Sequence, residues 1–153
     1  MSQPTAVEIK KIREETRAPV MDIRAALEEA SGDSAKAKVI LKKKGLEKAQ
    51  KKSGRETSQG LIETYVHAGG KVGAMVHLAC ETDFVAKTDE FKKLAKEIAM
   101  QVAAMNPKNS DELLDQEYSR EPEKKIKELI AEVVSKTGEN IQLQKIARFS
   151  LNE

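Results

Sequence analysis

The spacing of apolar residues changes several times along this chain, and those changes restrict its fold. In residues 5–44 and 88–105, apolar side chains recur every three or four positions, which predicts amphipathic helices. In residues 61–80 apolar and polar side chains alternate, which predicts strands with one buried face. The sequence therefore predicts an α+β fold: an N-terminal three-helix module, followed by a three-stranded antiparallel sheet packed with two helices.

Helix and domain boundaries follow from capping residues. A capping box at Thr5 is expected to begin the first helix, and Asp33 is expected to cap the third. Gly45 is predicted to end that third helix. The predicted domains are a three-helix domain at 1–45, a basic linker at 46–56, and an α+β core domain at 57–153.

The strands are predicted from period-two alternation. Gly69 and Gly70 separate two alternating stretches and predict a two-residue hairpin turn. The second strand is expected to bury one row of residues: Val72, Ala74, Val76, Leu78 and Cys80. A last strand is expected to place another row on one face: Ile141, Leu143, Ala147, Phe149 and Leu151. Between the two helices of the core domain, an acidic loop is expected to run to Pro122.

Composition narrows the class of protein. The formal net charge is +2 at pH 7, which is too small to argue for a nucleic-acid partner. A single cysteine excludes an internal disulfide framework and favours a reducing compartment. No stretch has the length of a signal core or a membrane span. A cytosolic protein without a membrane partner is expected.

Side chains suited to catalysis or metal binding are few. His67, His77 and Cys80 are too few for a structural zinc site, which takes four ligands. Cys80 as a nucleophile with a histidine base is an alternative, but its place on an apolar strand face favours a buried thiol. No glycine-rich phosphate-binding loop follows a strand. The sequence predicts a protein that is not an enzyme and has no metal or cofactor.

A basic segment at 42–55, "KKKGLEKAQKKSGR", allows two interpretations. It is either a nucleic-acid-binding module or a solvated, partly helical linker. The linker is favoured, because no aromatic residues interleave with the lysines to stack on bases.

Two apolar sites do not fit the predicted core. Phe84 follows a strand, precedes a helix and belongs to the apolar stripe of neither. Val20 and Met21 lie at a helix start, partly outside its apolar face. One interpretation is structural, with Phe84 closing the end of the core and Met21 capping the three-helix module. The other is that both sites bind a partner.

Three segments resemble the bacterial elongation factor Ts family. They are "IREETRAPVMDIRAALEEASGD", "CETDFVAKTDEF" and "KTGENIQL", in that order along the chain. The resemblance implies a guanine nucleotide exchange factor that binds elongation factor Tu during translation elongation, with a ubiquitin-associated-like N-terminal domain. A passive helical adaptor that uses only residues 5–44 is the alternative.

The resemblance also implies which residues bind elongation factor Tu. A wedge formed by Asp83 and Phe84 enters the partner's G domain near the magnesium side of the nucleotide pocket. The matching segment is Thr82, Asp83, Phe84 and Val85. The N-terminal residues that grip the G domain elsewhere are Arg13, Val20, Met21 and Arg24.

The chain is shorter than the short members of this family, which are thought to work as dimers. Only "NPKNSDELLDQEYSREP" separates its two core helices, where an additional helical segment is expected. The resemblance therefore implies a possible homodimer.

Overall fold

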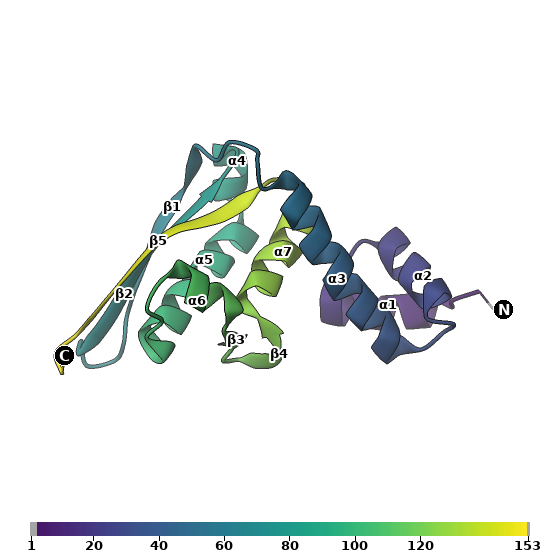
Figure 1. Cartoon of the computed structure of the whole chain (residues 1–153), viewed down its shortest axis with the longest axis horizontal. Coiled ribbons are helices and arrows are strands. Elements are labelled where there is room, and N and C mark those ends of the chain that lie inside the picture. Colours follow the sequence, from purple (N-terminus) through teal and green to yellow (C-terminus); the bar gives the residue numbers. More distant parts are fainter. Residues whose placement is uncertain (1–2, 153) are drawn as a thin grey trace.

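The computed structural model describes residues 3–152 and has two parts, a helical arm (α1–α3) and an α+β body (β1–β5 with α4–α7) (Figure 1). The arm contains α1 (Ala6–Thr16), α2 (Val20–Glu29) and α3 (Ser34–Lys52). The body contains β1 (Gln59–Val66), β2 (Val72–Cys80), α4 (Asp83–Ala86), α5 (Asp89–Met105), α6 (Ser110–Asp115), β3 (Glu117–Tyr118), β4 (Glu121–Lys125), α7 (Ile126–Thr137) and β5 (Ile141–Ser150). The predicted fold class is confirmed.

Local sequence explains where the helices of the arm begin. The Thr5 hydroxyl accepts a hydrogen bond from the backbone N–H of Glu8 at 3.2 Å, and the Glu8 carboxylate accepts from the backbone N–H of Thr5 at 2.8 Å. This is the predicted capping box. Asp33 caps α3 by accepting from the backbone N–H of Lys36 at 3.1 Å, also as predicted.

The predicted end of the third helix at Gly45 is wrong. Helix α3 continues through Gly45 to Lys52, so it includes most of the basic segment. A glycine inside a helix costs only about 1 kcal/mol relative to alanine, and the residues that follow are good helix formers. No helix among residues 3–152 is long and apolar enough to cross a membrane.

The arm and the body have separate hydrophobic cores. The core of the arm is small and aliphatic: Ile12, Ile23, Ala26, Leu27, Ala30, Ala37 and Leu41. The core of the body lies between the sheet and its helices, and Phe91 is its largest fully buried side chain. Each part has a core of its own, which is the usual property of a domain, and Ala49 near the end of α3 packs against the core of the body.

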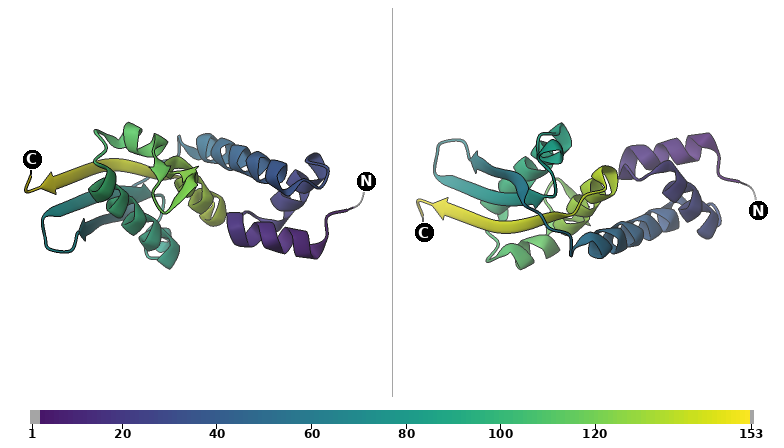
Figure 2. Two further views of the ribbon diagram at one scale, coloured as in Figure 1. Left: turned by 90° about the horizontal axis from the view of Figure 1, so that it is seen from below. Right: turned by 90° about the horizontal axis from the view of Figure 1, so that it is seen from above.

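Helices cover only one face of the main sheet, whose strand order is β1-β2-β5 (Figure 2). Helix α5 packs on β1 and β2, and helices α6 and α7 pack on β5. The row predicted for β2 is the face that they cover, since Ala74, Val76, Leu78 and Cys80 are all buried. The other face of the sheet is not covered by helices and is open over most of its length, although Ala79 near the end of β2 is buried.

The connection between β1 and β2 is longer than the predicted two-residue turn. It spans residues 67–71, and the backbone N–H of His67 donates to the carbonyl of Val72 at 2.8 Å. Gly69 and Gly70 have φ of 91° and 70°, values that glycine adopts without strain. The two glycines therefore mark the turn correctly but not its length.

A β-bulge overturns half of the prediction for β5. The pairing of β2 with β5 shifts between His77 and Leu78, which leaves Gln144 without a counterpart. Because side chains alternate with period two, one extra residue moves every later side chain to the other face. Ile141 and Leu143 face the core as predicted, but Ala147, Phe149 and Leu151 are exposed.

The segment between α5 and α7 is not the predicted acidic loop. It forms α6 and the small β3–β4 hairpin, and it buries Leu113 and Tyr118 against the core. The buried amide of Gln101 fixes this segment: it donates to the carbonyl of Glu117 at 3.0 Å and accepts from the backbone N–H of Ser119 at 3.0 Å. Charged residues dominate the sequence here, so the two buried apolar side chains give a weak signal.

Candidate functional site

Phe84 projects from a single helical turn between β2 and α5. In α4, the side chains of Val85 and Ala86 are buried, whereas 79% of Phe84 is exposed. Thr82 caps the turn, its hydroxyl accepting from the backbone N–H of Val85 at 3.3 Å. The interpretation of Phe84 as a plug for the core is therefore wrong. Val85 fixes the turn to the core, and Phe84 points away from it.

Asp83 is exposed beside Phe84. Its carboxylate pairs with the Lys87 ammonium at 3.2 Å, across one turn of helix. Exposed pairs of this spacing stabilise a helix by only about 0.3–0.5 kcal/mol. Asp83 also lies in the first turn of α4, where a negative charge is favoured. Its carboxylate remains accessible to a partner.

Carboxylates from both sides of the turn hold its base. The Glu139 carboxylate accepts from the backbone N–H of Glu81 at 3.1 Å, from that of Thr82 at 3.0 Å and from the Thr82 hydroxyl at 2.7 Å. In return, the Glu81 carboxylate accepts from the backbone N–H of Asn140 at 2.7 Å. The segment "KTGENIQL" therefore contacts the start of the Phe84 turn directly.

Cys80 ends β2 next to this turn and is buried, as predicted. Its thiol donates to the carbonyl of Thr82 at 3.1 Å. Burial, followed by the negative charge of Glu139, raises the pKa of the Cys80 thiol to about 11. A thiol with a raised pKa is mostly protonated at neutral pH and is a poor nucleophile.

We expect the native Cys80 thiol to react with an aromatic disulfide reagent about 100-fold more slowly at pH 8 than in the unfolded chain, because the thiolate is scarcer. The labelling rate of the native protein should keep rising towards pH 11, since a raised pKa moves ionisation to higher pH. Absorbance of the released thiolate measures both rates. Native labelling as fast as that of the unfolded chain would contradict the burial.

The predicted N-terminal grip is exposed on the arm. Met21 is 71% exposed, so its interpretation as a cap on the arm's core is wrong. Val20 and Arg24 lie four residues apart on the same helix, so their side chains share one face, and both are also exposed. Arg13 is exposed on α1. The grip and the Phe84 turn thus belong to different parts of the molecule (Figure 1).

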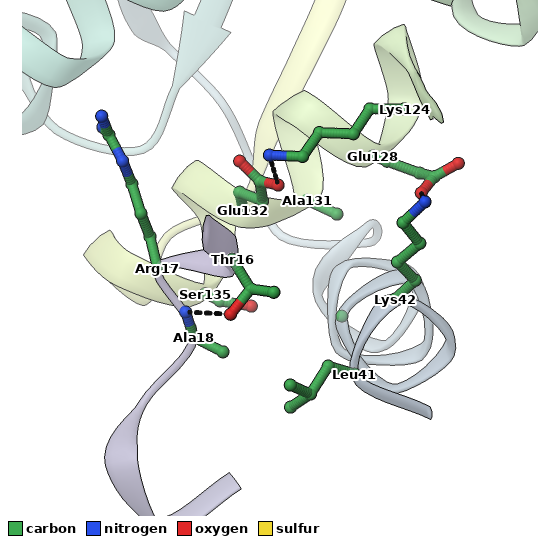
Figure 3. Close-up of a pocket in the computed structure, with 11 residues that line it drawn as sticks. Thr16, Arg17, Ala18, Leu41, Lys42, Lys124, Glu128, Ala131, Glu132 and Ser135 are labelled. Carbon is green, nitrogen blue, oxygen red and sulfur yellow. Dashed lines mark hydrogen bonds and ion pairs between the residues drawn. The ribbon is translucent and has the colours of Figure 1, made fainter. Parts of the chain in front are cut away.

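Polar contacts hold the arm against the body. The Lys42 ammonium of α3 lies 3.6 Å from the Glu128 carboxylate of α7, and within the body Lys124 pairs with Glu132 at 2.8 Å (Figure 3). Lys124 also donates to the carbonyl of Glu15 on the arm at 3.4 Å. A cavity of about 60 Å³ remains between these groups. These contacts set the position of the grip relative to the Phe84 turn.

Four of the seven basic residues in the basic segment form ion pairs within the chain. Its ion pairs are Lys42 with Glu128, Lys44 with Glu29, Lys48 with Asp22, and Arg55 with Glu81. A nucleic-acid site needs cations that are free to contact phosphates. These pairs favour the interpretation of the segment as structural.

Sequence reasoning located the Phe84 turn and the Met21 helix but missed the residues that support them. Glu81, Glu139 and Asn140 lie close together only in the folded chain, because nearly sixty residues separate the two sides. The available signal in the sequence was the polar run "GEN" directly before a strand. The glycine alone is enough to end a helix, so the two polar residues after it indicated a further role. The exposure of Phe149 was missed because no local pattern marked the bulge.

Comparison with known proteins identifies relatives of this chain. The family model described as "Elongation factor TS" matches residues 81–153. An elongation factor Ts from a Thermoanaerobacter species is 39% identical over 194 aligned positions, which cover 97% of this chain and 95% of the relative. One from a Thermotoga species is 40% identical over 95% of this chain and 94% of the relative.

The alignments with these relatives are also longer than this chain. The elongation factor Ts of an Anaeromyxobacter species is 39% identical over 198 positions, covering all of this chain and 90% of the relative. Because the alignment is longer than the chain, the relatives contain residues that have no counterpart here. Identity of this extent over nearly the full length shows that the chain belongs to the elongation factor Ts family, the non-enzymatic guanine nucleotide exchange factors of elongation factor Tu.

Proposed function

We propose that this chain releases GDP from elongation factor Tu by inserting Phe84 near the magnesium side of the partner's nucleotide pocket. The observation that carries the proposal is the exposed ring on a turn whose base is fixed by hydrogen bonds. A large exposed apolar side chain on a rigid support resembles the anchors that dominate protein interfaces.

The mechanism requires no covalent step. A phosphate-binding pocket depends on backbone donors, a lysine and a magnesium ion. A ring pushed between the helices of the G domain displaces groups near the metal and weakens the hold on GDP. Burying a phenylalanine side chain contributes roughly 1.5–3 kcal/mol, which offsets part of the distortion. Because coupling between two ligands is reciprocal, the chain binds nucleotide-free partner more tightly and speeds GDP release.

The two parts of the molecule have different tasks in this proposal. The helical arm anchors the partner through Arg13, Val20, Met21 and Arg24, and the body presents Asp83 and Phe84. Val85 and Thr82 keep the turn in place. The division into a three-helix domain at 1–45, a linker at 46–56 and a core domain at 57–153 is part of the proposal. It is supported by the two separate hydrophobic cores.

The direct test is the release of fluorescent GDP from elongation factor Tu. Release should accelerate with the concentration of this chain and then saturate, as expected for a factor that forms a complex with the GDP-bound partner. A chain that binds elongation factor Tu without changing the rate of release would be a passive adaptor. Binding of nucleic acid that weakens steeply with added salt would support the basic segment instead.

We expect Met21→Ala to raise the chain concentration needed for half-maximal GDP release by about 5-fold, as for an interface anchor worth about 1 kcal/mol. The maximal rate should stay unchanged, because Phe84 is intact. Val39→Ala is the matched control, since Val39 is another exposed apolar residue of the arm. A fall in the maximal rate with no change in the half-maximal concentration would contradict the anchoring role.

A second copy of this chain is the proposed occupant of the open face of the sheet. Exposed apolar side chains gather there: Ile62, Val66, Met75 and Phe149, with Leu151 just beyond the end of β5. The resemblance to the short members of the family implies a dimer, and an apolar face of this kind supplies a surface for one. A cytosolic location stays a prediction.

A further inference from the structure

Three segments that lie far apart in the chain meet at the base of the Phe84 turn. They are the residues after α3, the residues between β2 and α4, and the residues between α7 and β5. Asn140 is at their centre and only 1% exposed. Its side-chain amide donates to the carbonyl of Arg55 at 2.7 Å and to that of Ser53 at 3.4 Å. The end of the helical arm is therefore tied to the segment before β5.

Glu139 connects that segment to the turn. One of its carboxylate oxygens accepts from two successive backbone N–H groups, of Glu81 and Thr82, and the other accepts from the Thr82 hydroxyl. Hydrogen bonds to an ionised carboxylate are stronger than those between neutral groups. The Thr82 hydroxyl is also the N-cap of α4. Glu139 thus orients the group that begins the helical turn carrying Phe84.

The turn needs this external support. Helix α4 has only four residues, and a single helical turn is not stable by itself in water. Its direction is set by Val85, which is buried, and by the position of Thr82. A wedge has to meet its pocket in one orientation, so a turn that rotates freely would lose much of its effect.

We infer that Glu139 is a positioning residue for nucleotide exchange: its carboxylate holds the Thr82 cap so that Phe84 points in a fixed direction relative to the helical arm. The inference rests on the proposed role of Phe84. Glu81 and Asn140 complete the same hydrogen-bonded joint, since the backbone N–H of Asn140 donates to the Glu81 carboxylate. The joint therefore couples the two parts of the molecule that contact elongation factor Tu.

The test is a double-mutant cycle in the GDP-release assay. Glu139→Ala should lower exchange efficiency about 10-fold, a coupling within the usual range for residues that share one network. Glu139→Gln should stay within about 2-fold of the native chain, because its amide oxygen still accepts both backbone N–H groups. In a Phe84→Ala chain, Glu139→Ala should cause no further loss, since there is no ring left to position.

Glu112→Ala is the matched control. The Glu112 carboxylate also accepts from a backbone N–H, that of Lys108 at 3.1 Å, but it lies at the start of α6. It should leave exchange unchanged. The melting temperature of each variant is measured alongside.

Each other outcome overturns a specific claim. If Phe84→Ala retains full exchange, the proposed function fails, and the inference on Glu139 fails with it. If Phe84→Ala loses exchange but Glu139→Ala does not, only the inference fails. If Glu139→Ala causes the same loss with and without Phe84, Glu139 acts by another route. If Glu139→Gln is as impaired as Glu139→Ala, the hydrogen-bond account is wrong.

Discussion

Phe84→Ala is expected to lower the efficiency of GDP release about 30-fold while the chain's own melting temperature stays nearly constant. The loss corresponds to about 2 kcal/mol, the usual minimum for truncating a central aromatic anchor. Stability should change by no more than about 0.5 kcal/mol, because the ring is 79% exposed in the free protein. Release of fluorescent GDP and thermal unfolding of the same variant give the two measurements.

Phe91→Ala is the matched control, because it makes the same chemical change seven residues further along the chain. Phe91 is fully buried in the core of the body. Removing such a ring costs about 3–5 kcal/mol of stability, through lost burial and the cavity left behind. The two variants should therefore show opposite patterns: poor exchange with a normal melt for Phe84, and a strongly lowered melt for Phe91.

Two results with the Phe84→Ala chain would contradict the proposed role of Phe84 as a wedge. A Phe84→Ala chain that melts normally and exchanges normally would show that the ring has no part in GDP release. A large drop in its melting temperature would show that the ring packs within the chain in solution. Either result would leave the family membership intact and would remove Phe84 from the mechanism.

Much of the fold could be predicted because its signals are local. Helix starts depend on side chains that bond to nearby backbone groups, so Thr5 and Asp33 were recognisable as caps. The covered face of β2 was recognisable from alternation, since Ala74 and Leu78 are buried together. Periodicity reports which face is buried wherever the backbone stays regular.

The errors come from places where local sequence is ambiguous. Gly45 is compatible with a helix end and with a helix interior. It lies inside α3 because strong helix formers follow it. Gln144 gives no sign that it will be the extra residue of a bulge. That bulge turns Phe149 outward, so the alternation predicted for the end of β5 is reversed.

In the candidate site, too, local features could be predicted from the sequence and long-range contacts could not. Phe84 was recognisable because an apolar residue outside any stripe conflicts with the local pattern. Its support was not, because Glu139 reaches Thr82 across nearly sixty residues of chain. Contacts of that kind depend on how β2 and β5 pair, which alternation alone does not specify.

The reversed alternation at the end of β5 exposes Phe149 on the open face of the sheet, where the proposed homodimer would form. On the open face of the sheet, Val66 lies beside Gly73, and Gly73 lies beside Phe149. Because glycine has no side chain, nothing on the middle strand covers the Phe149 ring, which is 79% exposed. Met75 and Ala147 form the neighbouring row. This end of the face is exposed and apolar, and in the proposal it packs against the same face of a second copy.

We expect Phe149→Asp to raise the dissociation constant of the proposed homodimer about 1,000-fold. A two-fold symmetric interface uses the same patch twice, so a loss of about 2 kcal/mol at each copy counts double. The monomer should keep its melting behaviour when both chains are compared below the dissociation constant, because Phe149 is not part of the core. Sedimentation equilibrium measures the effect.

Val7→Asp, at another exposed apolar residue on the helical arm, should leave the dimer intact. A native chain that stays monomeric at high micromolar concentration would contradict the dimer. A dimer that survives Phe149→Asp would place its interface elsewhere on the chain.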